Sequence, residues 1–344
     1  MQYRRLGRTD LNVSRIGLGT MTWGQQNTEA EGHAQMDDAR ERGINFFDTA
    51  ELYSIPPRPE TQGSTERIIG TWFRTRGGRD KVVLASKVVG RSQNTWFRDG
   101  GVPTELSRAQ IEEAVNKSLR RLQTDYIDLY QLHFPDRPMT WGANPVIYRH
   151  QEGPSHPIGE ILESLQSLVK AGKVRHVGLS NESAWGTMTF LKHAETDGLP
   201  RVQSIQNAYN LVNRTFETAL AEVSVREEVS LLAYSPLGQG FLTGKYLDPP
   251  GARRTLFGRG QRYETPGAES AIGRYVALAR EFRVDPAQLA IAFVASRPFV
   301  TSTLIGATSM AQLETDIGSI GVMITEELED RIDAIHLAHT NPCP

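Results

Sequence analysis

The feature that most constrains this chain is a regular alternation of short, β-rich apolar runs with longer amphipathic stretches. The runs are "SRIGLG", "INFF", "KVVLAS", "YIDLYQL", "VRHVGL", "VQSIQ", "VSLLAY" and "TSTLI", in that order. Eight strands that alternate with helices are typical of an α/β fold whose parallel strands close into a (β/α)8 TIM barrel. An open doubly wound sheet is the alternative. The count of eight units, with no break in composition along 344 residues, favours the barrel.

Local signals indicate where several helices begin and end. A Ser or Thr that precedes a Glu or Gln by three residues predicts a capping box, at Thr28–Glu31 and at Ser107–Gln110. Asp285, followed by proline, predicts a third helix start. Helices are expected to end at glycines before the next strand: Gly43, Gly77 with Gly78, Gly172 and Gly198.

The two ends of the chain carry segments outside the repeat. The residues before Ser14 predict a small β-hairpin that closes the bottom of the barrel, and "TEELEDRIDAIHLAH" predicts an extra C-terminal helix packed outside it. Because no linker-like shift in composition occurs, we expect one domain over residues 1–344.

Composition excludes several classes of protein. A formal net charge of -2 argues against electrostatic capture of nucleic acid. The chain has no signal-peptide pattern and no run of about 18 apolar residues, so we expect a cytoplasmic protein that does not enter a membrane. The one cysteine, Cys343, excludes an internal disulfide and is expected to be a tail residue. The eight histidines form no zinc pattern, so no metal is predicted, and nothing indicates an oligomeric state.

Residues able to carry chemistry stand where the predicted strands end. Asp48 and Tyr53 follow "INFF", Lys87 follows "KVVLAS", and His133 follows "YIDLYQL". Alone, a histidine is often a hydrogen-bonded core residue and a lysine usually reaches solvent. The connections that leave strands are also long, and in a parallel barrel they meet at the carboxyl face, where active sites lie. Together on one rim, the four residues indicate a site.

The four residues suit proton transfer to a carbonyl oxygen. A phenol has a pKa of about 10, and an ammonium beside it, that of Lys87, is expected to lower the pKa of Tyr53. Asp48 can orient Lys87, and His133 can donate a hydrogen bond to a substrate oxygen. The sequence offers no evident nucleophile, so the group that attacks the carbon is expected to come from a cofactor.

At this point the sequence resembles the aldo-keto reductase family over essentially its whole length. The resemblance rests on "GLGTMTWG", "FFDTAELY", "SKV", "RLQTDYIDLYQLH", "GKVRHVGLSN", "QNAYN", "YSPLGQGFLTGKY" and "LIGATSMAQLETD". It implies a catalytic tetrad of Asp48, Tyr53, Lys87 and His133, with Tyr53 as the proton donor. It also implies NADPH as the cofactor and a small-molecule carbonyl substrate.

On the nicotinamide side the resemblance implies cofactor contacts from the strand ends: Thr20, Met21, Asp48, Ser180, Asn181, Gln206 and Tyr234. Three of these, Ser180, Asn181 and Gln206, would bind the carboxamide. Tyr234 would stack against the ring.

The resemblance also implies contacts on the phosphate and adenosine sides of the cofactor. The segment that wraps the pyrophosphate would comprise Ser235, Pro236, Leu237, Gly238, Gln239, Gly240, Leu242, Thr243 and Gly244. Adenosine contacts would come from Gly306, Thr308, Gln312 and Asp316. Thr315 departs from the glutamate that the family often has before the last of these.

Cofactor choice rests on "GARRTLFGRGQR". Arg253 stands where the family places a partner of the 2'-phosphate, and a guanidinium pairs with phosphate bidentately. The alternative is a solvated run of charge.

The resemblance implies an NADPH-dependent enzyme that reduces aldehydes or ketones to alcohols. A nucleotide-sensing regulatory subunit with poor turnover, like the potassium-channel β subunits of the family, is the alternative. An isomerase is a distant third, by fold analogy alone. Aromatic residues on the rim or long loops either line an apolar mouth or pack the loops: Trp23, Trp96, Phe97, Trp141 and Tyr148.

Overall fold

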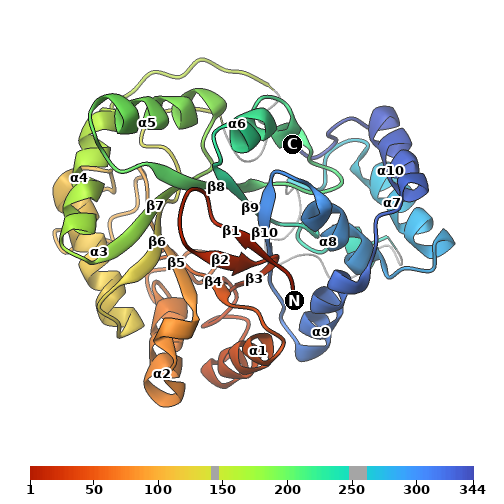
Figure 1. The fold of residues 1–344 in the computed structure, drawn as a ribbon, viewed down its shortest axis with the longest axis horizontal. Coiled ribbons are helices and arrows are strands. Elements are labelled where there is room, and N and C mark those ends of the chain that lie inside the picture. Colours follow the sequence, from red (N-terminus) through yellow and green to blue (C-terminus); the bar gives the residue numbers. More distant parts are fainter. Residues whose placement is uncertain (141–146, 248–261) are drawn as a thin grey trace.

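The eight predicted apolar runs form one closed barrel of parallel strands in the computed structural model, which describes residues 1–140, 147–247 and 262–344 (Figure 1). The strands lie in the order β10-β3-β4-β5-β6-β7-β8-β9. Their bounds are β3 Ile16–Gly19, β4 Phe46–Asp48, β5 Val83–Val88, β6 Ile127–Leu132, β7 Val174–Ser180, β8 Val202–Ala208, β9 Ser230–Tyr234 and β10 Val300–Ile305. The barrel prediction is confirmed.

Helices follow the barrel strands and surround them (Figure 1). They are α1 Glu29–Glu41, α2 Ser64–Arg76, α3 Arg108–Leu122, α4 Ile158–Lys170, α5 Ala184–Thr196, α6 Leu220–Arg226, α8 Pro286–Ser296 and α9 Met310–Gly318. The strand faces alternate, so that one set of apolar side chains packs under the helices and the other fills the barrel.

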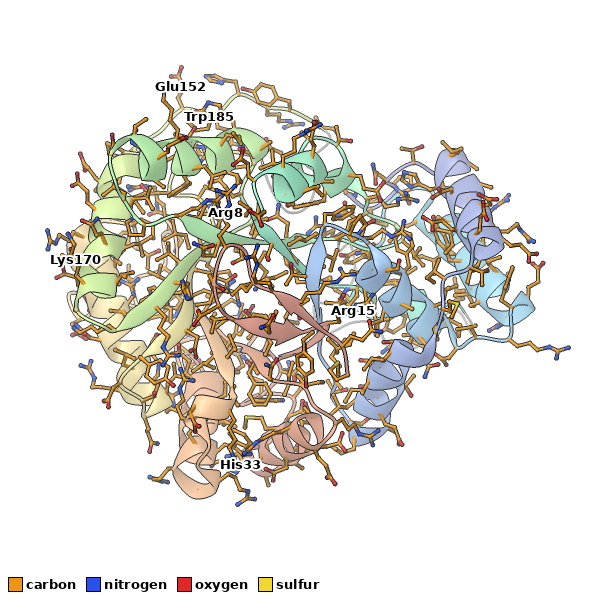
Figure 2. All side chains as sticks on the ribbon, in the orientation of Figure 1. Arg8, Arg15, His33, Glu152, Lys170 and Trp185 are labelled. Carbon is orange, nitrogen blue, oxygen red and sulfur yellow. The ribbon has the colours of Figure 1, made fainter. Side chains whose placement is uncertain are left out.

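The predicted N-terminal hairpin closes the amino end of the barrel. Strands β1 (Tyr3–Arg5) and β2 (Asn12–Ser14) pair antiparallel, and Figure 1 shows them across the barrel opening. Leu6 and Val13 of this hairpin are fully buried against side chains from inside the barrel, including Phe46 and Leu129. Arg8, labelled in Figure 2, pairs with Glu228 at 2.8 Å just before β9. The hairpin therefore completes the inner core.

Two further helices lie outside the barrel wall. α7 (Ala268–Glu281) precedes α8, and α10 (Glu326–Ala338) is the predicted C-terminal helix; Figure 1 shows them side by side. Arg331 of α10 pairs with Glu281 of α7 at 2.7 Å. In the described parts of the chain, no helix has the length and apolar character needed to cross a membrane.

All three predicted helix starts are confirmed, since Thr28, Ser107 and Asp285 are the N-caps of α1, α3 and α8. Thr28 and Glu31 form a reciprocal capping box, and Asp285 caps α8 by accepting from two backbone N–H groups. The box at Ser107 is wrong, because its side chain makes no capping bond. Gln110 instead accepts from the backbone N–H of Glu105, at 3.0 Å.

Candidate functional site

The four residues predicted to carry chemistry meet at the carboxyl ends of three adjacent strands. Asp48 is the last residue of β4, Lys87 is the next-to-last residue of β5, and His133 directly follows β6. Tyr53 lies in the turn after β4. Since all barrel strands are parallel, these ends share one rim of the barrel.

Lys87 is the centre of this group. Its Nζ donates to Asp48 Oδ2 at 2.6 Å, to the Thr49 carbonyl at 2.8 Å and to the Tyr53 hydroxyl at 3.3 Å. The side chain of Lys87 is completely buried, and that of Asp48 is 4% exposed. A buried ammonium thus joins a buried carboxylate to a phenol at the barrel mouth.

Burial and the neighbouring charges have opposing effects on the pKa values of Lys87 and Tyr53. Burial acts to lower the pKa of Lys87, but Asp48 and the Tyr53 phenol outweigh it and the pKa is raised, so the ammonium stays charged. Burial raises the pKa of Tyr53 although Lys87 opposes it. The expected net lowering of this pKa is therefore wrong: Lys87 acts in the predicted direction, but desolvation of the phenolate is the larger effect.

His133 completes the group as a neutral ring. Its imidazole meets the Tyr53 ring edge-on, with 5.6 Å between the ring centroids. Burial, and then the charge of Lys87, hold the pKa of His133 well below its usual range. Its Nδ1 is buried without a hydrogen-bond partner among the described residues. A buried polar atom normally has a partner, so the hydrogen-bonding capacity of this nitrogen is unmet in the described part of the chain.

Two glutamines hold the other oxygen of the aspartate. Gln206 Nε2 donates to Asp48 Oδ1 at 2.8 Å, and Gln131 Nε2 does so at 3.2 Å. The sequence reasoning missed Gln131. The alternation along β6 could have found it, because Gln131 lies two residues before His133 and so on the same face of the strand.

The residues expected around the nicotinamide gather at this rim. Thr20 Oγ1 donates to the Asp48 carbonyl at 2.9 Å, and Asn181 Nδ2 donates to the His133 carbonyl at 2.9 Å. The Tyr234 hydroxyl donates to Asn181 Oδ1 at 2.7 Å. Ser180 Oγ donates to the Gln206 carbonyl at 2.9 Å. Met21, after β3, is partly buried, and its carbonyl accepts from the Ile55 N–H at 2.9 Å.

The segment expected to wrap the pyrophosphate has an unusual backbone. Ser235 and Gln239 have φ of 55°, in the left-handed region that residues with a side chain seldom adopt. Glycines at 238, 240 and 244 also have positive φ. Gln239 Oε1 is buried without a hydrogen-bond partner among the described residues. Strained backbone of this kind clusters at ligand sites, and the orphaned amide oxygen points the same way.

The adenosine-side residues lie after β10 and on α9. The Thr308 N–H donates to Gln312 Oε1 at 2.9 Å, so these two are already linked. Asp316 is buried, and burial together with Asp285 raises its pKa to about 7, against the opposing charge of Lys245. Gly306 directly follows β10. The predicted 2'-phosphate partner, Arg253, lies outside the described residues.

Comparison with known proteins settles what kind of chain this is. Residues 15–336 match the model of the aldo/keto reductase family. The chain belongs to this family. It is 48% identical to "Protein tas" of Escherichia coli (strain K12), with both chains covered completely. It is 33% identical to "Uncharacterized oxidoreductase YrpG" of Bacillus subtilis, over 95% of this chain and 94% of the relative. It is 30% identical to a "Probable voltage-gated potassium channel subunit beta" of Oryza sativa subsp. japonica, over 97% and 96%.

Family membership implies an oxidoreductase that acts on a small molecule. The similarity to potassium-channel β subunits, expected from the motifs, is confirmed. In the described residues no group of three or more His, Cys, Asp or Glu is placed to hold a metal ion.

The aromatic residues that could either line a mouth or pack the loops differ in burial. Trp23 is fully buried, with its Nε1 donating to Gln35, and Phe97 is 2% exposed, so both pack the protein interior. Trp96 and Tyr148 are exposed. Trp141 lies outside the described residues.

Arg262 is a neighbour of the site that sequence reasoning did not single out. Its Nη1 donates to the Tyr234 hydroxyl at 3.4 Å, and its Nε donates to the Pro344 carbonyl at 3.1 Å. Cys343, expected to be a tail residue, is fully buried beside it. No spacing rule could have found this link, because the partners are far apart in sequence.

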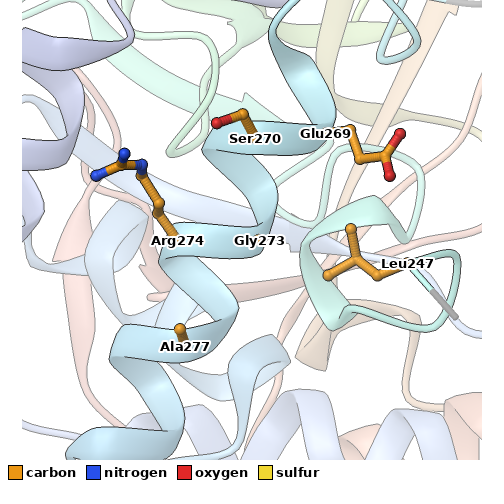
Figure 3. Close-up of a pocket in the computed structure, with 6 residues that line it drawn as sticks. All are labelled: Leu247, Glu269, Ser270, Gly273, Arg274 and Ala277. Carbon is orange, nitrogen blue, oxygen red and sulfur yellow. The ribbon is translucent and has the colours of Figure 1, made fainter.

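A surface hollow on α7 is separate from the site (Figure 3). It is lined by Leu247, Glu269, Ser270, Gly273, Arg274 and Ala277. None of the described residues predicted for the site lines it.

Proposed function

We propose that this chain reduces aldehydes or ketones to alcohols with NADPH, with Tyr53 as the proton donor. The observation that carries the proposal is the contact of Lys87 Nζ with both Asp48 Oδ2 and the Tyr53 hydroxyl, beside a neutral His133. This is the arrangement that the family resemblance predicts for its tetrad.

The residues present fit a nicotinamide dinucleotide. Gln239 and His133 each bury a polar atom that has no partner among the described residues, one in the pyrophosphate segment and one beside Tyr53. We propose that the strand-end residues Thr20, Met21, Asp48, Ser180, Asn181, Gln206 and Tyr234, with the segments at 235–244 and 306–316, hold NADPH. When bound, this cofactor supplies the hydride.

The protein's own part is to bind and protonate the carbonyl oxygen. Tyr53 gives the proton, and the Lys87 ammonium stabilises the phenolate that remains. Asp48 holds Lys87 in place and is itself held by Gln131 and Gln206. His133 is neutral, so a ring N–H can donate to the same carbonyl oxygen without repelling Lys87.

A screen of aldehydes, ketones and sugars that follows NADPH absorbance tests the proposal. We expect turnover with at least one reactive aldehyde and a much weaker rate with NADH. The proposed preference for NADPH rests on Arg253, because a guanidinium can form charge-assisted hydrogen bonds with the 2'-phosphate that NADH lacks. No oxidation of NADPH by any carbonyl compound would contradict the proposal.

A second candidate is an NADPH-sensing regulatory subunit that turns over poorly. The similarity to relatives named as potassium channel β subunits, from rice and from Arabidopsis thaliana, favours it. Such a protein would bind NADPH with the same residues, so binding does not distinguish the two. Steady-state turnover does: a few cofactor equivalents consumed, followed by arrest, would favour the regulatory subunit.

Two predictions from the sequence accompany the proposal. A single domain over residues 1–344 predicts one cooperative unfolding transition by calorimetry. A cytoplasmic location predicts recovery in the cytosolic fraction of cells that express the chain.

A further inference from the structure

A buried ion pair involves the turn that carries the proposed proton donor. Glu51 belongs to the stretch "DTAELY", two residues before Tyr53, and Arg98 belongs to the long connection between β5 and α3. Both side chains have an exposed fraction of 0%. Arg98 Nη1 donates to Glu51 Oε2 and Nη2 donates to Oε1, each at 2.9 Å. This two-bond geometry is the strongest form of ion pair.

Glu51 also ties the turn that carries Tyr53 to the strand that carries Lys87. The backbone N–H of Glu51 donates to the Lys87 carbonyl at 3.2 Å. Its carboxylate Oε1 accepts the N–H of Val89, just after β5, at 2.8 Å. Glu51 therefore brackets Val88, the residue directly after Lys87, through its main chain and its side chain.

Arg98 makes this bracket possible. A carboxylate with no exposed surface is costly unless a cation meets its charge, and removing the cation leaves an uncompensated buried charge. Arg98 is itself held, since its Nε donates to Gln110 Oε1 at 3.2 Å at the start of α3. Without Arg98, Glu51 gains by turning toward water, and that movement pulls on the turn before Tyr53.

The contact that this movement would disturb is a loose one. Lys87 Nζ lies 3.3 Å from the Tyr53 hydroxyl, compared with 2.6 Å from Asp48. Tyr53 also contacts the ring of His133, and Asp48 and, more weakly, Tyr234 act to raise its pKa. A small shift of the turn therefore changes the Lys87–Tyr53 contact before it changes the Lys87–Asp48 pair.

We propose that Glu51 and Arg98 are positioning residues that set the distance between the Tyr53 hydroxyl and the Lys87 ammonium. This inference rests on the proposed function of Tyr53 as the acid. Both side chains are fully buried, so they act through Tyr53 and Lys87 and not on the substrate.

The chain contains a matched pair at the opposite end of the same strand. Asp128 is buried, accepts the N–H of Leu84, near the start of β5, at 3.0 Å, and pairs with Arg79 at 2.7 Å. The Asp128–Arg79 pair thus also combines a buried carboxylate, an arginine and a backbone N–H of β5. It lies at the amino end of β5, whereas Lys87 and Tyr53 lie at the carboxyl end. Arg79→Met is the control for a weakened buried ion pair, since Arg175 still contacts Asp128 at 3.1 Å.

The experiment compares Arg98→Met, Glu51→Gln, their double variant and Arg79→Met, each checked for folding by circular dichroism. We expect each single change at Glu51 or Arg98 to lower kcat for aldehyde reduction at least tenfold while KM for NADPH changes less than about threefold. The alkaline limb of the kcat–pH profile should move to higher pH, because the Lys87 ammonium then lies farther from the Tyr53 phenolate and stabilises it less. Arg79→Met should keep kcat within about twofold of wild type.

The double variant separates positioning from lost stability. The amide oxygen of Glu51→Gln can still accept the Val89 N–H, and with Arg98→Met no buried charge is left unpaired. We therefore expect the double variant to be faster than either single variant. A rate as slow as the product of the two single effects would overturn the proposal. If Arg98→Met does not fold, Arg98→Lys, which keeps the charge but not the paired hydrogen bonds, should show the same loss of kcat in smaller form.

A measurement without turnover keeps this inference distinct from the proposed function. Tyrosine labelled with carbon-13 at Cζ reports phenol titration by NMR, and Tyr53→Phe assigns the Tyr53 signal. We expect the Tyr53 pKa to rise in Arg98→Met and to stay unchanged in Arg79→Met, whether or not a substrate is known. A Tyr53 titration and a kcat that are both unchanged in Arg98→Met would overturn the proposal. Wild-type protein that reduces no carbonyl compound would overturn the proposed function alone.

Discussion

The two ends of the barrel each bury an aspartate beside cations, but the cations differ in what they do next. At the amino end, Asp128 accepts from Arg79 at 2.7 Å and from Arg175 at 3.1 Å. The other N–H groups of Arg79 donate to the carbonyls of Val82 and Tyr126 and to the hydroxyl of Thr124. An arginine stays charged at any physiological pH, so this network is fixed.

At the carboxyl end, Asp48 accepts from Lys87, which turns another N–H to the hydroxyl of Tyr53. A phenol can give up its proton, and an ammonium beside it stabilises what remains. His133 next to it keeps a buried nitrogen without a partner among the described residues. The comparison teaches that a buried ion pair serves structure where its donors are used up within the protein. It can support proton transfer where one of its N–H donors instead contacts a titratable side chain at the carboxyl rim of the barrel, as Lys87 contacts Tyr53.

The largest expected difference between the two ends is that between Lys87→Met and Arg79→Met. Lys87→Met leaves Tyr53 without its cation, so we expect kcat to fall by ~10²-fold or more, the scale of general-acid catalysis. Arg79→Met should instead destabilise the fold by about 3 kcal/mol, the low end for a broken buried pair because Arg175 remains. Steady-state kinetics and thermal unfolding of both variants check this. Equal losses of kcat would remove the distinction between the ends.

Cofactor choice is the next largest effect. We expect Arg253→Ala to weaken NADPH binding by about 1.5–3 kcal/mol, the value of a charge-assisted hydrogen bond, and to leave NADH binding unchanged. Fluorescence titration with both cofactors measures it. A preference for NADPH that survives in the variant would remove Arg253 from the site.

A milder effect is expected at Asp48 itself. Asp48→Asn leaves Lys87 charged but takes away the carboxylate that orients it, so kcat should fall by ~10-fold, less than for Lys87→Met. The pH profile of kcat for the two variants shows whether the order holds. A greater loss for Asp48→Asn than for Lys87→Met would mean that the carboxylate does more than orient Lys87.

No effect is expected from chelation. Both buried aspartates have their charge met by protein cations, and the proposed stabilisation of the substrate oxygen uses Tyr53 and His133 as hydrogen-bond donors. Activity after exhaustive treatment with a chelator should equal that before it. Loss of activity that added zinc restores would contradict this mechanism.

The sequence predicted the barrel because each strand corresponds to a short apolar run, as "KVVLAS" does to β5. It predicted the meeting of Asp48, Tyr53, Lys87 and His133 because parallel strands place their carboxyl ends on one rim. Both predictions need only the local pattern and the topology.

What the sequence could not predict depends on side chains that meet across the fold. The net direction of the Tyr53 pKa requires the balance of burial against Lys87, and burial wins. The reciprocal bond of the capping box at Ser107 is absent, and the Gln110 side chain instead accepts from Arg98 and from the Glu105 N–H. Whether Trp23 lines a mouth or packs the protein was left open by the sequence, and in the structure it is buried with its Nε1 donating to Gln35. None of these contacts is visible from spacing along the chain.

Single-turnover reduction of a reactive aldehyde by Tyr53→Phe, with saturating NADPH, is the most direct test of Tyr53 as the proton donor. The substitution keeps the aromatic ring and deletes the hydroxyl whose proton is transferred. We predict NADPH binding close to wild type and a rate of chemistry lower by ~10²-fold or more. A wild-type rate of chemistry in this variant would contradict the role of Tyr53 as the proton donor.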